Sequence, residues 1–140
     1  MDVIWLTRKT LYNGEMFSGI ICLESASCYH GLSTAPPNPL LIYTTFEPKI
    51  ETEFLTTIPV SEIDYTDTIH LGYKLYVTDP YRTVYDMIKY NTTGRFLYES
   101  LDRFGALYNY LQLIDYMNKH NLGQVFKQIE KEKDMYFEDD

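Results

Sequence analysis

Residues 72–88 decide the fold, and they read Gly72-Tyr73-Lys74-Leu75-Tyr76-Val77-Thr78-Asp79-Pro80-Tyr81-Arg82-Thr83-Val84-Tyr85-Asp86-Met87-Ile88. The first half alternates apolar and polar side chains, with Leu75 and Val77 on one side, as a half-buried strand does. In the second half, Val84, Met87 and Ile88 recur at helical spacing. The stretch therefore predicts a strand that runs directly into a helix.

Asp79 and Pro80 mark the start of that helix. The carboxylate of Asp79 can accept a hydrogen bond from a free amide of the first turn. Pro80 has a fixed φ and lacks the N–H that would have no helical partner at the first position. We therefore expect Asp79 to cap a helix that begins at Pro80.

Composition and charge limit the classes of protein to consider. The chain has 140 residues, of which 45% are hydrophobic and 16% aromatic, including 14 tyrosines. This length can bury a core as one domain without disulfides or metal. The net charge is −8, and only Arg8 and Lys9 are adjacent basic residues. This balance argues against nucleic-acid binding over the whole surface, because phosphate contacts need clustered Lys and Arg.

The two cysteines predict a reducing compartment. Cys22 and Cys28 are six residues apart in a predicted helix, so their side chains point to different sides and should not bridge. We expect buried thiols. The chain shows no secretory signal and no apolar run long enough for a bilayer. The expected location is the cytoplasm, of a bacterium or of the host if the gene is carried by a phage.

The remaining patterns predict an α+β fold, with a small mixed sheet, one short early helix and helices at the carboxyl end. Gly31 should end the early helix in a left-handed conformation. Gly72 should mark a turn or bulge. The other expected strands are 3–6, 10–12 (before a turn at Asn13-Gly14), 40–45, 54–58 and the region of Ile69 and Leu71, and the expected helices are 23–31, 95–104, 107–120 and a segment from Leu122.

The carboxyl-terminal part carries three further expectations. We expect residues 1–130 to form a single domain and the acidic tail 131–140 to fray. Gly105 should separate two helices. The buried face of the second of these helices is predicted to carry Leu107, Tyr110, Leu111, Ile114 and Met117.

Three segments carry a resemblance to a known family. The first is Glu24-Ser25-Ala26 followed by His30-Gly31-Leu32-Ser33, and the second is Gly72 through Ile88, in which Val77 through Asp86 carries the motif. The third and weaker one is 97–101 with 111–125. They resemble the antitoxin domain of the AbiEi family, from type IV toxin–antitoxin systems of bacterial abortive infection. The first is similar to the family's S-A pair before H-G-L, and the second to its V-T-S-P-E-R-T-L-x-D junction. The positions that match or stand in for the motif are Glu24, Ser25, His30, Gly31, Asp79, Pro80, Arg82, Thr83 and Asp86.

This chain departs from the family pattern in informative ways. Tyr81 stands where the family has Glu, and Asp79 where Ser or Thr is usual. We find no room for the winged helix-turn-helix that binds the operon's promoter in the family. The resemblance therefore implies the antitoxin half without the autorepressor half.

The resemblance implies a stand-alone antitoxin-type domain that neutralises a nucleotidyltransferase-like toxin. Such a toxin should have an electropositive active site, towards which a partner of charge −8 would be steered. The alternative is a phage-type acidic anti-defence protein, anti-CRISPR-like, that inhibits a nucleic-acid-binding effector. Both imply a protein partner, with no direct nucleic acid and no membrane.

The sequence predicts no enzyme, and no catalytic, cofactor or metal site. His70 and His120 are isolated, and Ser25 and Ser27 lack a nucleophile elbow. No glycine cluster forms a phosphate-binding loop. We expect His30 to bond the last carbonyls of its own helix. An enzyme and a DNA-binding protein remain the lowest-ranked alternatives.

Two groups of residues have alternative interpretations. Asp79, Arg82 and Asp86 form either a local ionic staple or a polar site for a partner or ligand, and we favour the staple. Four tyrosines of the helical part either pack at the edge of the core or contact a protein partner. They are Tyr98, Tyr108, Tyr110 and Tyr116.

Overall fold

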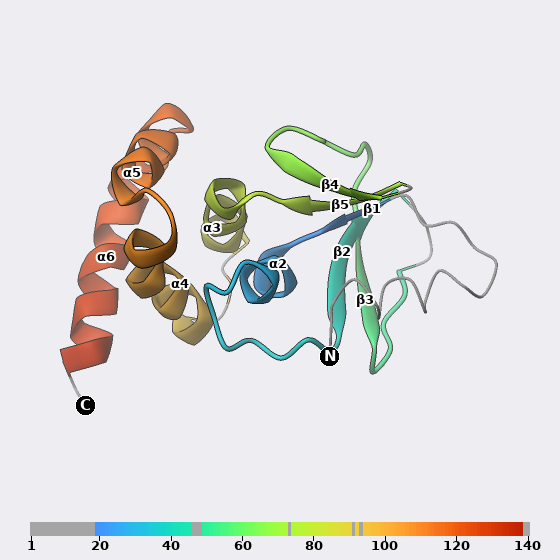
Figure 1. Ribbon diagram of the computed structural model, residues 1–140, viewed down its shortest axis with the longest axis horizontal. Helices are drawn as coiled ribbons and strands as arrows, with labels where there is room; N and C mark the ends of the chain where they lie inside the picture. Colours follow the sequence, from blue (N-terminus) through green and yellow to red (C-terminus); the bar gives the residue numbers. More distant parts are fainter. Residues whose placement is uncertain (1–18, 46–48, 73, 91, 93, 139–140) are drawn as a thin grey trace.

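The computed structural model describes residues 19–45, 49–72, 74–90, 92 and 94–138. These residues form a mixed sheet and a group of helices, which is the α+β arrangement that the sequence predicts (Figure 1). The strands expected at 3–6 and 10–12, with the turn at Asn13-Gly14, lie outside the described residues.

The sheet has the strand order β3-β2-β1-β5-β4. The pairs β1/β5 and β2/β3 are parallel, whereas β1/β2 and β4/β5 are antiparallel. The sequence did not predict β1, because three residues are too few to show an alternating pattern. The strands are β1 (Gly19–Ile21), β2 (Leu40–Thr44), β3 (Leu55–Pro59), β4 (Thr68–Gly72) and β5 (Leu75–Thr78).

The junction between β5 and helix α3 (Pro80–Lys89) confirms the prediction. Asp79 caps the helix, since its Oδ1 accepts a hydrogen bond from the backbone N–H of Arg82 at 2.8 Å. Gly72 lies at a register shift in the β4/β5 ladder with a φ of 128°, so the expected bulge is present.

The other described helices are α2 (Leu23–Tyr29), α4 (Gly94–Leu107), α5 (Tyr110–Lys119) and α6 (Gly123–Glu138). Figure 1 shows α2 and α3 between the sheet and the group α4–α6. Gly31 follows α2 with a φ of 74°, the left-handed conformation expected of it. Among the described helices, none combines the length and the apolar character needed to cross a membrane.

Three expectations for the helical part are wrong. Gly105 lies inside α4. Leu111 is 74% exposed, and Leu113 is buried in its place because α5 begins after an Asn109 cap. The tail does not fray before Glu138: it continues α6, and the Tyr136 ring packs against Tyr98 with centroids 5.2 Å apart.

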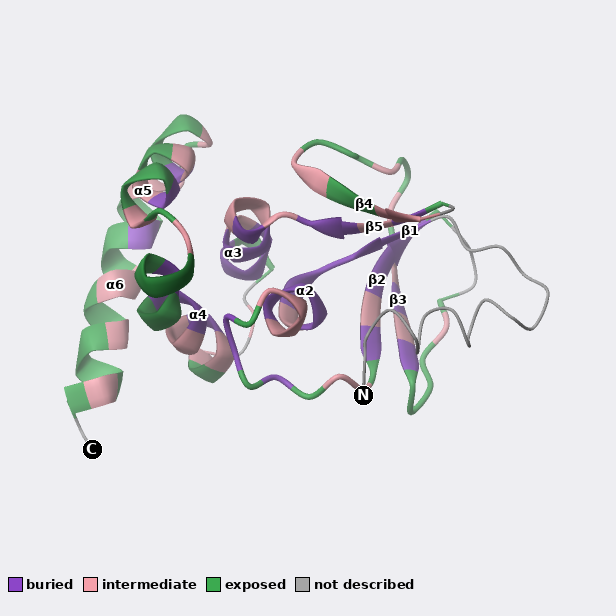
Figure 2. Ribbon diagram, viewed as in Figure 1, coloured by how far each residue is buried: buried purple, intermediate pink, exposed green. Residues whose placement is uncertain are grey.

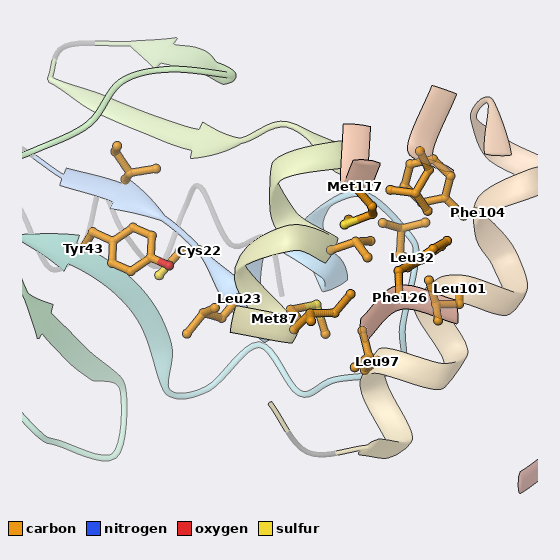
Figure 3. Packing of buried hydrophobic residues seen from close by; sticks show 14 residues of the cluster. Cys22, Leu23, Leu32, Tyr43, Met87, Leu97, Leu101, Phe104, Met117 and Phe126 are labelled. Atoms are coloured by element: carbon orange, nitrogen blue, oxygen red, sulfur yellow. The ribbon is translucent and has the colours of Figure 1, made fainter. Parts of the chain in front are cut away.

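The core has a cluster on each face of the sheet. The larger cluster joins Ile20 and Tyr43 to the helices, and the smaller one contains Ile21, Ile42 and Val77. Figure 2 shows buried segments on β1, β2 and β5 and on the helices α2 and α3. A fully buried side chain of this kind contributes about 1.5–3 kcal/mol relative to an exposed one. Figure 3 shows the larger cluster, whose helical members include Met87, Leu97, Leu101, Phe104, Leu113, Met117 and Phe126.

Both cysteines are free thiols, as expected. Cys22 is buried, and Cys28 is only partly buried. Cys22 lies just before α2 with an extended backbone, and not inside the helix as the sequence predicts. Burial raises the pKa of the Cys22 thiol, and the nearby Asp86 carboxylate acts in the same direction.

Candidate functional site

Two buried threonines join the end of β5 to the first turn of α3. The hydroxyl oxygens of Thr78 and Thr83 are 2.6 Å apart, and both residues are fully buried. The Thr83 hydroxyl also lies 2.6 Å from the carbonyl oxygen of Asp79. These contacts satisfy polar groups that would otherwise be costly inside the protein.

His30 connects three elements of the fold, and its expected role is wrong. Its Nε2–H donates to the carbonyl oxygen of Thr78 at 2.7 Å, rather than to the end of its own helix. The carbonyl of His30 accepts a hydrogen bond from the Tyr108 hydroxyl at 3.2 Å. Burial lowers the pKa of His30, so the neutral ring is favoured. The residue therefore ties α2 to β5 and to the turn after α4.

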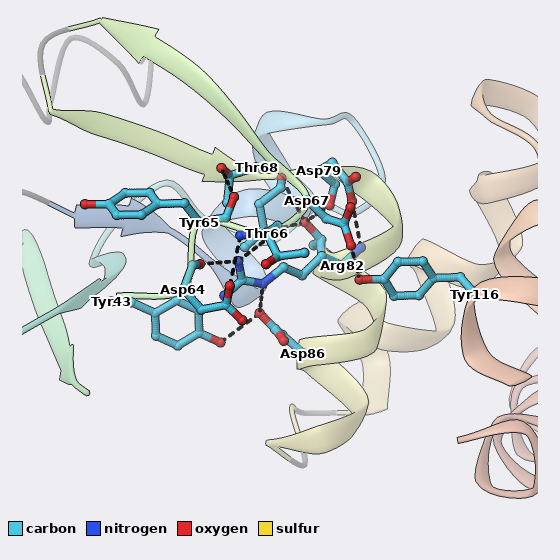
Figure 4. A network of polar contacts seen from close by, with 12 residues as sticks. Tyr43, Asp64, Tyr65, Thr66, Asp67, Thr68, Asp79, Arg82, Asp86 and Tyr116 are labelled. Atoms are coloured by element: carbon cyan, nitrogen blue, oxygen red, sulfur yellow. Dashed lines mark hydrogen bonds and ion pairs between the residues drawn. The ribbon is translucent and has the colours of Figure 1, made fainter. Parts of the chain in front are cut away.

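Arg82 fastens a distant loop to α3. Its Nη1 donates to the carbonyl oxygens of Asp64 and Thr66 at 2.6 and 2.7 Å, and its Nε lies 3.3 Å from Oδ2 of Asp86 (Figure 4). Asp64 and Thr66 belong to the loop of residues 60–67 that connects β3 to β4. Arg82 therefore has two roles: it forms the local ion pair with Asp86, and it holds the loop of residues 60–67 against α3.

Asp86 is the buried partner of this arginine. The residue is 5% exposed, and its Oδ2 also accepts a hydrogen bond from the Tyr43 hydroxyl at 3.0 Å. Burial raises the pKa of Asp86, while Arg82 and Tyr43 oppose that shift. A buried charge held this way is sensitive to the loss of one partner.

The carboxylate of Asp67 forms a second link between the loop and the helices. Its Oδ2 accepts from the Tyr116 hydroxyl at 2.9 Å, and its carbonyl accepts from the N–H of Asp79 at 2.9 Å. Burial raises the pKa of Asp79, and the negative charge of Asp67 acts in the same direction. Asp79 therefore has two roles: its backbone N–H bonds the loop of residues 60–67, and its carboxylate caps α3.

These contacts border a cavity of about 290 Å³. Its cationic side chains are Arg82 and Lys89, and the ring of His120 also lines it. Its aromatic walls are tyrosines and its carboxylates outnumber the permanent cations. These residues are Tyr43, Tyr85, Tyr90 and Tyr116, with Glu62, Asp64, Asp67 and Asp86, and the cavity is completed by Ile20, Val60 and Thr66.

The family-motif residues Glu24 and Ser25 lie in α2 and do not line this cavity. Gly31, which follows α2, and Pro80, the first residue of α3, do not line it either. Ser25 is buried, and its hydroxyl oxygen accepts a hydrogen bond from the N–H of Leu41 at 2.8 Å, which fixes α2 to β2. Glu24 is partly buried in the first turn of α2. The structure therefore brings Arg82 and Asp86 to the cavity, whereas Asp79 caps α3 and does not line the cavity.

The four tyrosines of the helical part, which either pack at the edge of the core or contact a partner, make separate hydrogen bonds. Each hydroxyl donates a hydrogen bond within the chain. Tyr98 donates to Glu132 and Tyr108 to the carbonyl of His30. Tyr110 donates to Glu130 and Tyr116 to Asp67. Only Tyr116 of these four lines the cavity. This arrangement agrees with the interpretation of tyrosines at the edge of the core.

Sequence reasoning missed most of the cavity wall. Tyr43 lies in β2, whereas Tyr85 lies in α3 and Tyr90 directly follows that helix. No spacing in the sequence joins Tyr43 to α3. The run Asp64-Tyr65-Thr66-Asp67 was the available signal, because it places two carboxylates next to turn-forming residues. Among the described residues, no three His, Cys, Asp or Glu side chains are grouped to hold a metal ion.

The charged side chains and tyrosine rings that line the cavity suit the binding of a charged ligand. No family model, curated protein or solved structure matches the chain. The fold and the cavity together define an acidic α+β domain with a tyrosine-walled polar cavity beside α3.

Proposed function

We propose that this chain is an antitoxin-type domain that binds and neutralises a nucleotidyltransferase-like toxin, without catalysis of its own. One observation carries the proposal: Arg82 and Asp86, at positions of the motif that resembles the AbiEi junction, build the wall of the acidic cavity. A motif whose residues form a cavity wall is a reason to look for a ligand there.

The charge of the chain supports a basic partner. The net charge is −8, and two ion pairs form among the described residues, Arg82–Asp86 and Lys133–Asp134. Most described carboxylates are therefore left without a basic side chain at ion-pair distance. A toxin site that binds nucleoside triphosphate is electropositive, and opposite charge speeds association. We propose that the two proteins meet in the cytoplasm.

Growth rescue tests this proposal. We expect co-expression with a nucleotidyltransferase toxin of the abortive-infection type to restore growth, and the two proteins to elute as one complex in size-exclusion chromatography. The double variant Glu62→Lys/Asp64→Lys should lose both effects. Glu53→Lys/Asp102→Lys is the matched control, because both residues are exposed and neither lines the cavity. No rescue by the unmodified chain would contradict the proposal.

A second candidate is an acidic inhibitor of a nucleic-acid-binding effector, of the anti-CRISPR kind. The unpaired carboxylates favour it, because they can occupy a site made for phosphates. It predicts that duplex DNA or RNA competes with the chain for a purified effector. A complex that forms equally well in excess nucleic acid would contradict this candidate.

A further inference from the structure

We propose that the cavity beside α3 receives the guanidinium or ammonium group of one Arg or Lys side chain from a protein partner. This inference deepens the proposed function and rests on it for the identity of the partner. The chemistry of the cavity can be tested without that partner.

The size of the cavity favours a single side chain. Its volume is about 290 Å³, at the lower end of the range for sites that bind small molecules. A whole nucleotide needs more room than one amino-acid side chain. Ile20 and Tyr43 of the sheet line the cavity together with residues of α3.

The tyrosine rings already attract cations within the chain. The Lys89 ammonium lies 5.9 Å from the centroid of the Tyr85 ring, and the Arg82 guanidinium carbon lies 5.9 Å from that of Tyr43. Ring faces of this kind stabilise a positive group by about 0.5–2 kcal/mol. Lys89 is exposed, so an incoming cation can displace it from Tyr85.

The carboxylates determine the sign of the charge that a ligand of this cavity should carry. Four of them line the cavity, against the two permanent cations Arg82 and Lys89. Arg82 is held by Asp86 and by two loop carbonyls. Both described hydrogen bonds to Asp86 end on Oδ2, and the residue is 5% exposed at the cavity wall. Glu62 and Asp64 stand exposed at the rim. The excess of negative charge favours a cation over a phosphate.

The ring packing keeps the site open in a defined shape. Tyr116 stacks near His120 with centroids 4.3 Å apart, and Tyr85 lies 6.0 Å from Tyr116. Tyr90 lies 6.0 Å from Tyr43 on the other side. Packed aromatic walls lose little entropy on binding, which favours recognition of a small group.

Ligand titration followed by amide NMR tests the inference on the full chain. The probes are N-acetyl-arginine N-methylamide, its neutral isostere N-acetyl-citrulline N-methylamide, and inorganic phosphate. We expect saturable shifts around residues 60–67 and α3 with the arginine probe, and none with the other two. Saturable binding of phosphate, equal binding of the citrulline probe, or no saturable shift with arginine would overturn the inference.

Two sets of variants sharpen the test. Lys89→Met removes the competing cation and should strengthen arginine binding by about threefold, whereas a phosphate site would be weakened by it. Glu62→Gln/Asp64→Asn should weaken arginine binding by about threefold or more. Glu53→Gln/Asp102→Asn should leave it unchanged. Weaker arginine binding by Lys89→Met would overturn the inference.

The inference and the proposed function can fail separately. If the arginine probe binds but the chain does not rescue growth, the cavity assignment stands and the antitoxin proposal falls. If the chain rescues growth and the arginine probe does not bind, the antitoxin proposal stands and the cavity assignment falls.

Discussion

The two ends of the helical layer are held together by different kinds of contact. Around the start of α3, buried polar groups converge from several segments, with Thr78, Arg82 and Asp86 bonded to partners far away in the sequence. In the group α4–α6, apolar side chains such as Phe104 and Phe126 fill the interior, and tyrosine hydroxyls bond at the edge. The first region is specified by hydrogen bonds and the second by packing.

This difference predicts how each region responds to substitution. Removing one partner of a buried polar network leaves another group unsatisfied, so small chemical changes have large effects there. Removing a buried ring leaves a cavity whose cost follows its size. Substitutions on the exposed faces of α4–α6 should have little effect.

The largest expected effect is in the packed region. Phe104→Ala should lower the free energy of unfolding by about 3–5 kcal/mol, because the side chain is fully buried among helices. Urea unfolding measures it. Leu111→Ala is the control and should change the free energy by less than about 0.5 kcal/mol, since Leu111 is 74% exposed. A similar loss for both variants would contradict the assigned face of α5.

Next in size is the loss of Arg82 from the polar region. Arg82→Met should lower the free energy of unfolding by about 3 kcal/mol at pH 7, because Asp86 is left buried and charged. The loss should shrink as the pH falls through the raised pKa of Asp86 and the carboxylate becomes neutral. The double variant Arg82→Met/Asp86→Leu should recover part of the stability. A double variant that sums the two single losses would contradict a coupled pair.

A hydroxyl deletion has a smaller expected effect. Thr83→Val keeps the shape of the side chain but leaves the Thr78 hydroxyl without its partner, and should cost about 1–3 kcal/mol. Thermal and urea unfolding give the value. Thr56→Val, on a partly buried residue of β3, is the control and should have less effect. Equal stability of Thr83→Val and the unmodified chain would show that the hydroxyl pair contributes nothing.

The smallest expected effect is a pH dependence from His30. Because its pKa is lowered on folding from the ordinary 6.5, the unfolded chain binds the proton more readily. The stabilising contribution is therefore fully present above pH 6.5 and is lost as the pH falls through the folded pKa. His30→Gln should remove this part of the pH dependence between pH 7 and pH 5. An unchanged profile would contradict the buried neutral ring.

Local chemistry made part of this fold predictable from the sequence. Asp79-Pro80 and Gly31 mark helix ends through contacts within a few residues, and both predictions are confirmed. Asn109 caps α5 by the same chemistry, whereas Gly105, which predicts a helix end, lies inside α4. A helix counted from Leu107 therefore predicts Leu111 on the buried face, although Leu111 is exposed. A glycine inside a helix costs only about 1 kcal/mol, which packing can offset.

The candidate site was less predictable because its contacts join residues that are far apart in the sequence and belong to different strands, helices and loops. The bond from Tyr43 to Asp86 joins β2 to α3, and Arg82 reaches back to Asp64. Both depend on β1, which lies between β2 and β5 and is too short to recognise by its pattern. The sequence identified Arg82 and Asp86 as a pair. It did not identify the loop and the tyrosine that make the pair part of a cavity.

Arg82 is the residue that holds the loop of residues 60–67 against α3 beside the cavity. Amide hydrogen exchange of Arg82→Lys tests this directly, since the single ammonium of lysine lacks the planar fork by which Nε bonds Asp86 while Nη1 bonds the two loop carbonyls. We predict at least about tenfold faster exchange at the N–H of Asp79, which donates to Asp67, with the interior amides of α3 unchanged. Unchanged exchange at Asp79 in this variant would contradict the account.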